Sequence, residues 1–209
     1  VGEFEDWDLN GQGTFNYPDG SIYAGGFIDG EYNGHGKFTS IADGDGYEGE
    51  WRNGKKQGEG IHYDKDGQRY EGEWKNDKEN GYGKLTLVNL GSYEGQFING
   101  RQHGEGSLTF ENGYKISGEW RFGSIFKGVA IWPNGNKYEG EFKHWDWHGH
   151  GKFSIPDGHH IIGKFKDRKP WDTIEYDKNG FIVGKVVDGV QTKGNSSQIT
   201  PKLEVDVSS

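Results

Sequence analysis

The sequence contains no cysteine, no methionine and only five prolines among its 209 residues. Without cysteine there is no disulfide framework and no thiolate zinc site, which fits a reducing compartment. No apolar run approaches the roughly 20 residues that a membrane-spanning helix needs, and no signal peptide is visible. Because the chain has no initiator methionine and opens at Val1 inside a repeat, we expect its N-terminus to be processed or truncated.

Hydrophobic residues are also scarce, and glycine and aromatic residues take their place. Hydrophobic residues make up 30% of the chain, aromatics alone 15%, and 38 residues are glycine. The aromatic content argues against disorder, and the glycines do not follow the three-residue period of collagen. A formal net charge of −9 disfavours nucleic acid as a partner, because nucleic-acid binders usually present a basic face. Burial in the folded protein must therefore rest on aromatic rings.

One glycine recurs at spacings of 21 to 24 residues along almost the whole chain. A period this regular indicates a repeat architecture. Partial units stand at both ends of the repeated region, and the complete units begin at Tyr23, Tyr47, Tyr70, Tyr93, Ile116, Tyr138 and Ile161.

Within a unit, aromatic residues and glycines alternate as they do in strands. Position 1 is Tyr or Ile, position 3 is Gly and position 5 is Phe or Trp; Gly returns at positions 12 and 14, and an Asp-Gly or Asn-Gly turn follows in several units. Alternate residues of a strand share a face, so each unit predicts a hairpin of two antiparallel strands. The predicted core of the clearest units consists of Tyr47, Gly49, Trp51, Tyr70, Gly72, Trp74, Tyr93, Gly95, Phe97, Tyr138, Gly140 and Phe142.

Glycine weakens a strand, so its repeated use needs a reason, and space for an aromatic ring beside the backbone supplies one. We expect the two strands of a unit to pair so that large rings face glycines and acidic residues face lysines. The predicted cross-strand pairs are Trp74 with Gly83, Gly72 with Leu85, Glu73 with Lys84 and Glu141 with Lys152. No unit can bury its aromatic face alone, so the units are expected to stack.

These residues resemble the MORN repeat (membrane occupation and recognition nexus), whose pattern is Y-x-G-x-[WF], then G-x-G, then an Asp-Gly or Asn-Gly turn. The chain contains "YEGEWRNGKKQGEG", "YEGEWKNDKENGYG", "YEGQFINGRQHGEG" and "YEGEFKHWDWHGHG". The resemblance covers about residues 1–190 and implies an all-β fold, an elongated single-sheet β-meander solenoid of 8–9 hairpin repeats. Residues 191–209 are predicted to form a linker and a C-terminal tail or capping strand.

The resemblance implies a non-catalytic scaffold or adaptor that binds a protein partner through its repeat surface or groove. Homodimers and weak membrane or phosphoinositide association are further modes that it implies, in a cytoplasmic assembly that is cytoskeletal or membrane-proximal. Two alternatives stay open. One is the regulatory MORN module of a larger enzyme, of the lysine methyltransferase or phosphatidylinositol phosphate kinase type. The other is a carbohydrate-binding repeat module. The repeat spacing argues against it, because it places the aromatic rings over glycines and not in solvent.

No catalytic, cofactor or metal site is predicted, and we expect the protein not to be an enzyme. "GDGYEG" (Gly44–Gly49) matches a dinucleotide fingerprint but does not open a helix, and "DKDG" at Asp64 lacks the spacing of a calcium loop. The histidines between residues 144 and 160 cluster without a thiolate, and Asp167 interrupts the basic run of residues 164–169. The residues themselves therefore give little support to a zinc site or a polybasic lipid site.

One irregular unit is the predicted partner-binding region. The unit from Ile116 is one residue shorter than most and keeps only Gly128 of its G-x-G pair. Large apolar residues there and in the next unit occupy turns that are polar elsewhere, and interfaces favour Trp, Phe and Tyr anchors. Two interpretations are open: an exposed patch that binds a partner, or packing on the displaced backbone or the C-terminal tail. The candidate residues are Phe122, Ile125, Phe126, Trp132, Trp145, Trp147 and Trp171.

Overall fold

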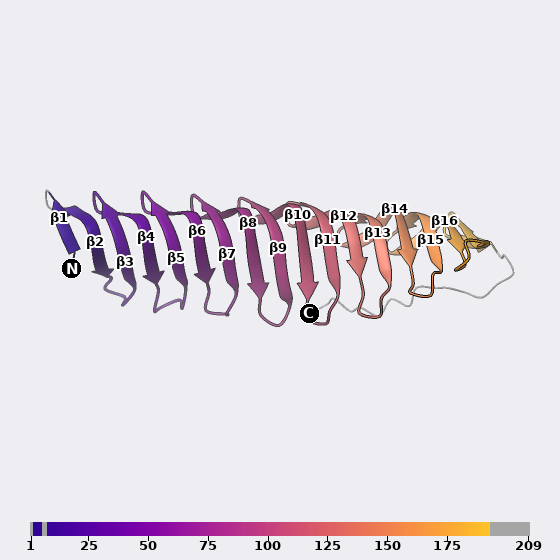
Figure 1. The fold of residues 1–209 in the computed structure, drawn as a ribbon, viewed down its shortest axis with the longest axis horizontal. Coiled ribbons are helices and arrows are strands. Elements are labelled where there is room, and N and C mark those ends of the chain that lie inside the picture. Colours follow the sequence, from indigo (N-terminus) through magenta and orange to yellow (C-terminus); the bar gives the residue numbers. More distant parts are fainter. Residues whose placement is uncertain (1, 6–7, 193–209) are drawn as a thin grey trace.

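The chain forms one elongated antiparallel sheet. A computed structural model describes residues 2–5 and 8–192, which contain 18 strands and no helix. Figure 1 shows the strands following one another along the long axis in sequence order. The prediction of an all-β meander of 8–9 hairpin repeats is confirmed, because the 18 strands make nine hairpins.

The strands are short and similar in length, as expected for a repeat. Their bounds are β1 Gly2–Glu5, β2 Asp8–Asn16, β3 Ile22–Ile28, β4 Glu31–Thr39, β5 Gly46–Arg52, β6 Lys55–Tyr63, β7 Arg69–Lys75, β8 Lys78–Leu87, β9 Gly91–Ile98, β10 Arg101–Phe110, β11 Lys115–Arg121, β12 Ser124–Ile131, β13 Lys137–Lys143, β14 Asp146–Ser154, β15 His160–Lys166, β16 Lys169–Tyr176, β17 Ile182–Val187 and β18 Val190–Thr192.

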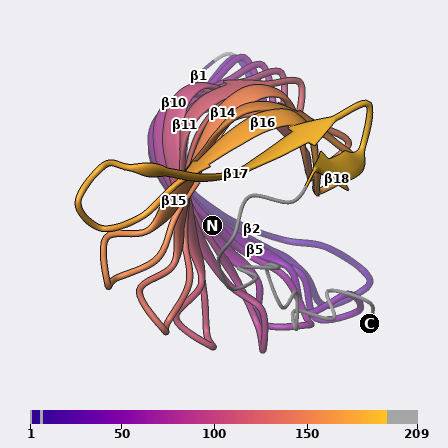
Figure 2. The same ribbon diagram turned by 90° about the vertical axis from the view of Figure 1, so that its right-hand side faces the viewer.

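Each strand pairs with the next one in sequence, from β1–β2 to β17–β18. Two-residue turns, which we call the short turns, close the hairpins from β3–β4 to β17–β18. Longer turns of three to six residues connect successive hairpins and lie along the lower edge of the sheet in Figure 1. Figure 2, along the long axis, shows these longer turns spread into a fan because the sheet twists.

The predicted strand register is wrong by two residues. In hairpin β7–β8, Gly72 lies opposite Gly83 and not opposite Leu85. Trp74 lies opposite Gly58, on the last strand of the preceding hairpin. An irregularity between Gly72 and Trp74, which we call the bulge, shifts the register, because β8 has two more residues than β7 there, and simple counting of alternate positions does not detect it. The predicted association of rings with glycines survives, but the tryptophan reaches across to a neighbouring unit.

The tyrosine that opens a regular unit packs on the backbone of its own hairpin. The Tyr70 hydroxyl donates to the carbonyl oxygen of Glu73 at 3.0 Å, and any side chain at Gly83 would overlap the Tyr70 ring. Burial raises the pKa of this hydroxyl, so it remains a donor. The same bond to position 4 is made by Tyr23, Tyr47, Tyr93 and Tyr138.

The aromatic residue at position 5 joins neighbouring hairpins. The indole nitrogen of Trp74 donates to the carbonyl oxygen of Gly60 in the preceding unit at 3.1 Å. The rings of Tyr47 and Trp74 meet edge to face with centroids 5.2 Å apart, an arrangement that contributes about 0.5–1.5 kcal/mol beyond area burial. Equivalent contacts between units join Tyr23 to Trp51, Tyr70 to Phe97, Tyr93 to Trp120 and Tyr138 to Phe165.

The acidic residue at position 4 stabilises the bulge and does not pair with a lysine. Gly81 has a φ of +75°, which favours glycine, and the Glu73 side chain lies over it. The Glu73 carboxylate accepts the backbone N–H of Tyr82 at 2.7 Å. Lys84 stands opposite Glu71 instead. The predicted Glu73–Lys84 pair is therefore wrong.

The same arrangement recurs in hairpin β13–β14. The Glu141 carboxylate accepts the backbone N–H of His150 at 2.9 Å, and Lys152 stands opposite Glu139. The predicted pair of Glu141 with Lys152 is wrong for the same reason, since the bulge shifts the register before the acidic residue. In these two units the carboxylate at position 4 therefore stabilises the backbone where the register of the hairpin shifts.

The unit from Ile116 closes without a tyrosine. Ile116 and Ile125 are each 2% exposed and Ala130 is fully buried, so aliphatic side chains fill the space that a ring takes elsewhere. Gly118 still lies opposite Gly128 across hairpin β11–β12. The sheet therefore continues without interruption through the irregular unit.

The array continues through β18 to Thr192, two residues past the predicted limit of residue 190. The predicted linker and capping strand fall mostly in residues 193–209, which lie outside the described residues. The division into an array and a tail therefore stays a prediction.

Candidate functional site on the short turns

The structure separates the seven candidate residues into buried and exposed side chains. Ile125 and Trp147 are each 2% exposed, because both occupy position 10 of their units, which faces the aromatic core. For these two residues the packing interpretation holds, and neither can anchor a partner. Trp132 and Trp171 are half-buried: the Trp132 ring packs against Tyr114, with centroids 5.0 Å apart.

Three candidates remain exposed, and all lie in or beside short turns. Phe122 is 65% exposed, Phe126 38% and Trp145 43%. Phe122 belongs to the short turn of β11–β12, Phe126 to β12, and Trp145 to the short turn of β13–β14. We call these three residues the aromatic turn patch.

The backbone of these turns holds bulky side chains in a conformation that favours glycine and asparagine. The φ angle is +51° at Phe122 and +70° at Trp145, whereas a regular short turn carries Asn53 and Gly54 at the same positions. Two-residue hairpin turns of type I′ need positive φ at both residues. A side chain in this region costs roughly 1–2 kcal/mol relative to glycine. The fold therefore does not require Phe or Trp here, and strain of this kind concentrates at functional sites.

Each exposed ring lies against one neighbouring side chain. The Phe122 ring lies 5.2 Å from that of His103, and the guanidinium of Arg121 lies 3.4 Å from the centre of the Phe126 ring. The Trp145 ring meets a neighbouring indole edge to face at 5.4 Å, that of the buried Trp120. These contacts orient the rings and leave the rest of their surface available to a partner.

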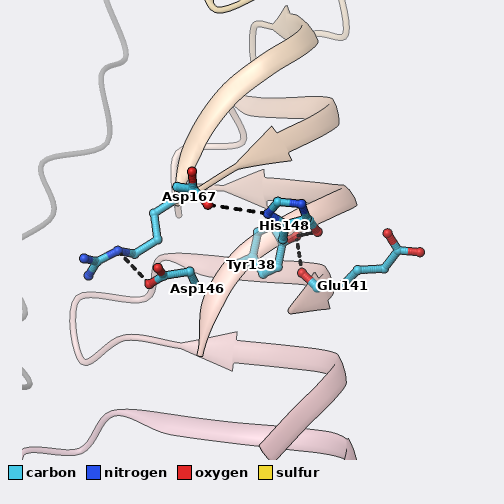
Figure 3. Close-up of polar contacts among 6 residues, drawn as sticks. Tyr138, Glu141, Asp146, His148 and Asp167 are labelled. Carbon is cyan, nitrogen blue, oxygen red and sulfur yellow. Dashed lines mark hydrogen bonds and ion pairs between the residues drawn. The ribbon is translucent and has the colours of Figure 1, made fainter. Parts of the chain in front are cut away.

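An ion pair and a carboxylate–imidazole contact connect the start of β14 to the short turn of β15–β16. Figure 3 shows Asp167, in the short turn of β15–β16, beside His148 of strand β14, with Asp146 at the start of the same strand. Asp146 pairs with Arg168 at 2.9 Å, and Asp167 lies 3.7 Å from the Nδ1 atom of His148. Beneath them the Tyr138 hydroxyl lies within 3.3 Å of the His148 carbonyl oxygen, to which it donates. These contacts hold two neighbouring hairpins together beside Trp145, one residue of the aromatic turn patch.

A second candidate is a recess of about 250 Å³ on the aromatic face. The Lys56 ammonium lies 4.9 Å from the centre of the Tyr47 ring and 4.8 Å from that of Trp74. Burial lowers the pKa of Lys56, and burial together with Lys56 lowers the pKa of His62. Lys56 occupies position 10, the place of Trp147 in its unit, and so covers a repeat tyrosine. We therefore assign this recess to packing.

Other kinds of site find little support in the described part of the chain. Residues 2–5 and 8–192 contain no group of three His, Asp or Glu side chains placed to hold a metal ion. In the same residues, no helix is long and apolar enough to cross a bilayer. The repeat tyrosines are at most 2% exposed in the units from Tyr23, Tyr47, Tyr70, Tyr93 and Tyr138, so they cannot stack on a sugar.

Comparison with known families gives one match. Six segments match the MORN repeat, over residues 2–22, 23–41, 47–69, 70–92, 93–113 and 138–160. The units from Ile116 and Ile161, in which isoleucine replaces the first tyrosine, lie outside these segments. No curated protein matches the sequence.

Comparison with solved structures gives one similar fold and one weaker match. The G-box domain of the microcephaly protein CPAP has 14% sequence identity and a TM-score of 0.54, over 87% of this chain and 97% of that one. A mutant of the TCP10 domain of Danio rerio CPAP has 9% identity and a TM-score of 0.40, over 88% of this chain and 89% of that one.

Proposed function

Because this chain belongs to the MORN-repeat family, we propose that it is a non-catalytic scaffold that binds a protein partner through the aromatic turn patch. The observation that carries the proposal is the placement of Phe122 and Trp145, which are exposed at turn positions where the backbone favours asparagine or glycine. Aromatic side chains with this exposure are the usual anchors of protein interfaces.

The elongated sheet supports a structural role for the protein. Adjacent units place the aromatic rings on a rigid edge, and interface residues on rigid elements lose little entropy on binding. The G-box structure, whose fold this chain resembles, was taken to suggest a role in centriole elongation. A scaffold in a cytoplasmic, cytoskeletal assembly would suit a sheet of this shape.

The proposal is tested by comparing a turn variant with the wild-type chain. Proteins captured from a lysate by the tagged full chain are identified and purified, and their affinities are then measured. We expect the variant Phe122→Asn/Trp145→Gly to bind the partner at least about tenfold more weakly, since each anchor of an interface contributes about 1 kcal/mol or more. The matched control Ile28→Ser changes an exposed apolar residue beside another short turn and should bind normally. Wild-type affinity in a folded double variant would overturn the proposal.

A further inference from the structure

Six consecutive short turns carry a positive charge that contrasts with the rest of the chain. Together with the residues that flank them they contain ten Lys or Arg and three Asp, a net charge of +7, whereas the whole chain has −9. All ten cationic side chains are exposed. Phe122 and Trp145 lie among them. We call this edge the short-turn ridge, which comprises residues 52–55, 75–78, 98–101, 121–124, 143–146 and 166–169.

Folding does not explain this distribution of charge. Three of the hairpins close on two cations directly opposite each other, and like charges in that position destabilise a sheet. Opposite charges would serve the hairpins better, so the cations have another use. The three closing pairs are Arg52 with Lys55, Lys75 with Lys78, and Lys166 with Lys169.

The three carboxylates of the ridge leave most of the cations unneutralised, because each already has a neighbour. Their partners are the backbone N–H of Lys56 for Asp77, the guanidinium of Arg168 for Asp146, and the imidazole of His148 for Asp167. Within residues 9–192, two of the ten ridge cations, Arg121 and Arg168, form an ion pair. The other eight are exposed and form no ion pair among these residues, although the Lys166 ammonium lies 4.3 Å from the centre of the Trp171 ring.

The spacing of the ridge fits an extended chain in the polyproline II conformation. Successive short turns are two strands apart, which is about 10 Å, and such a chain advances roughly 3.1 Å per residue with three residues per turn. Every third side chain points the same way and would therefore meet the next turn. Because the sheet twists (Figure 2), the turns follow a curved line that a flexible chain can track and a flat bilayer cannot touch along its whole length.

We propose that the short-turn ridge binds an extended acidic polypeptide, with a carboxylate at about every third position and an apolar residue against the aromatic turn patch. The inference rests on the proposed function, because it supplies the chemistry of that partner. Carboxylates of the polypeptide take the place of the missing counterions, and the charge complementarity sets its register along the array. An acidic polypeptide would be attracted to this basic edge and repelled by the rest of the acidic protein.

The test measures binding of a fluorescein-labelled peptide to the full chain by anisotropy at fixed salt. The peptide has about 18 residues, repeats Glu-Gly-Ser, and carries one central Leu. A ridge variant loses five cations, and a control variant loses five exposed lysines from strands and longer turns, so both have the same net charge. The ridge variant is R52Q/K75Q/R101Q/K143Q/K169Q, and the control variant is K65Q/K84Q/K115Q/K152Q/K178Q.

We expect the ridge variant to bind the peptide at least about tenfold more weakly than wild type, and the control variant to change less than about twofold, because exposed charge pairs contribute up to about 1 kcal/mol each. Equal losses in both variants would overturn the inference, since net charge alone would explain them. Tighter binding of phosphatidylserine vesicles or of single-stranded DNA than of the peptide would also overturn it. Circular dichroism checks that both variants are folded.

The two proposals fail separately. If the ridge variant keeps wild-type affinity for the peptide while Phe122→Asn/Trp145→Gly loses the captured protein, the acidic-polypeptide inference is wrong and the proposed function stands. If the ridge variant loses the peptide while the aromatic variant still binds the captured protein, the ridge inference stands and the aromatic patch is not the protein-binding site.

Discussion

At the scale of single residues, Phe122 and Trp145 stand where asparagine or glycine would give a more stable turn. The equivalent position of another hairpin carries Asn53 at the same φ of about +50°. The chain therefore gives up stability at these positions in exchange for an exposed ring. A stability measurement can detect this exchange without knowledge of the partner.

The substitution Phe122→Asn should stabilise the protein. Asparagine tolerates the left-handed conformation better than phenylalanine, so we expect a gain of about 0.5–1 kcal/mol, or a melting temperature higher by a few degrees. The reverse change Asn53→Phe, in a turn with the same backbone, should destabilise by a similar amount. Thermal unfolding followed by circular dichroism measures both. A lower melting temperature for Phe122→Asn would show that the ring serves the fold.

A second prediction concerns the half-buried His62. Its pKa is lower in the folded protein than the ordinary value of about 6.5, mainly because of burial and then because of Lys56. The unfolded chain therefore binds a proton more readily as the pH falls, and the folded protein loses stability below about pH 6.5. His62→Leu places the residue that Leu85 supplies in the next unit. We expect the variant to lose less stability than wild type between pH 7.5 and pH 5, measured by urea unfolding; equal losses would refute this role of His62.

At the scale of the hairpin, the sequence predicts the elements well and their register poorly. The alternation of Tyr, Gly and Trp predicts the strands because alternate side chains share a face. The bulge after Gly72 leaves no mark in that alternation, so the pairing of glycine with leucine was wrong. Alignment by position also explains the buried candidates: Ile125 and Trp147 share position 10, which faces the core, with Tyr32. Comparison of position 10 between units could therefore have predicted from the sequence that Ile125 and Trp147 are buried.

The glycines of the hairpin should be intolerant of any side chain. A methyl group at Gly83 would overlap the Tyr70 ring, so we expect Gly83→Ala to cost about 2–3 kcal/mol, a typical overpacking penalty. Gly54→Ala is the control, because nothing lies within 4 Å of a Cβ there and only its positive φ of +69° is unfavourable. Its cost should be about 1 kcal/mol. Urea unfolding measures both variants, and equal costs would contradict the packing of Tyr70 on Gly83.

At the scale of the whole molecule, the array is a twisted sheet with distinct edges. Its longer turns resemble ordinary hairpin connections, with Asp-Gly and Asn-Gly pairs at several of them. The short-turn ridge combines eight cations that form no ion pair among the described residues with two exposed aromatic turn residues, Phe122 and Trp145. Partner binding is therefore expected along the edge of the short turns.

Amide hydrogen exchange of the full chain, with and without the captured partner, tests this expectation most directly. The account predicts that the partner slows exchange in residues 119–126 and 142–148, which contain the aromatic turn patch, and leaves the longer turns at residues 64–68 and 155–159 unchanged. Free turn amides exchange quickly, so protection there would be easy to detect. Protection confined to the longer turns or to the aromatic face would contradict it.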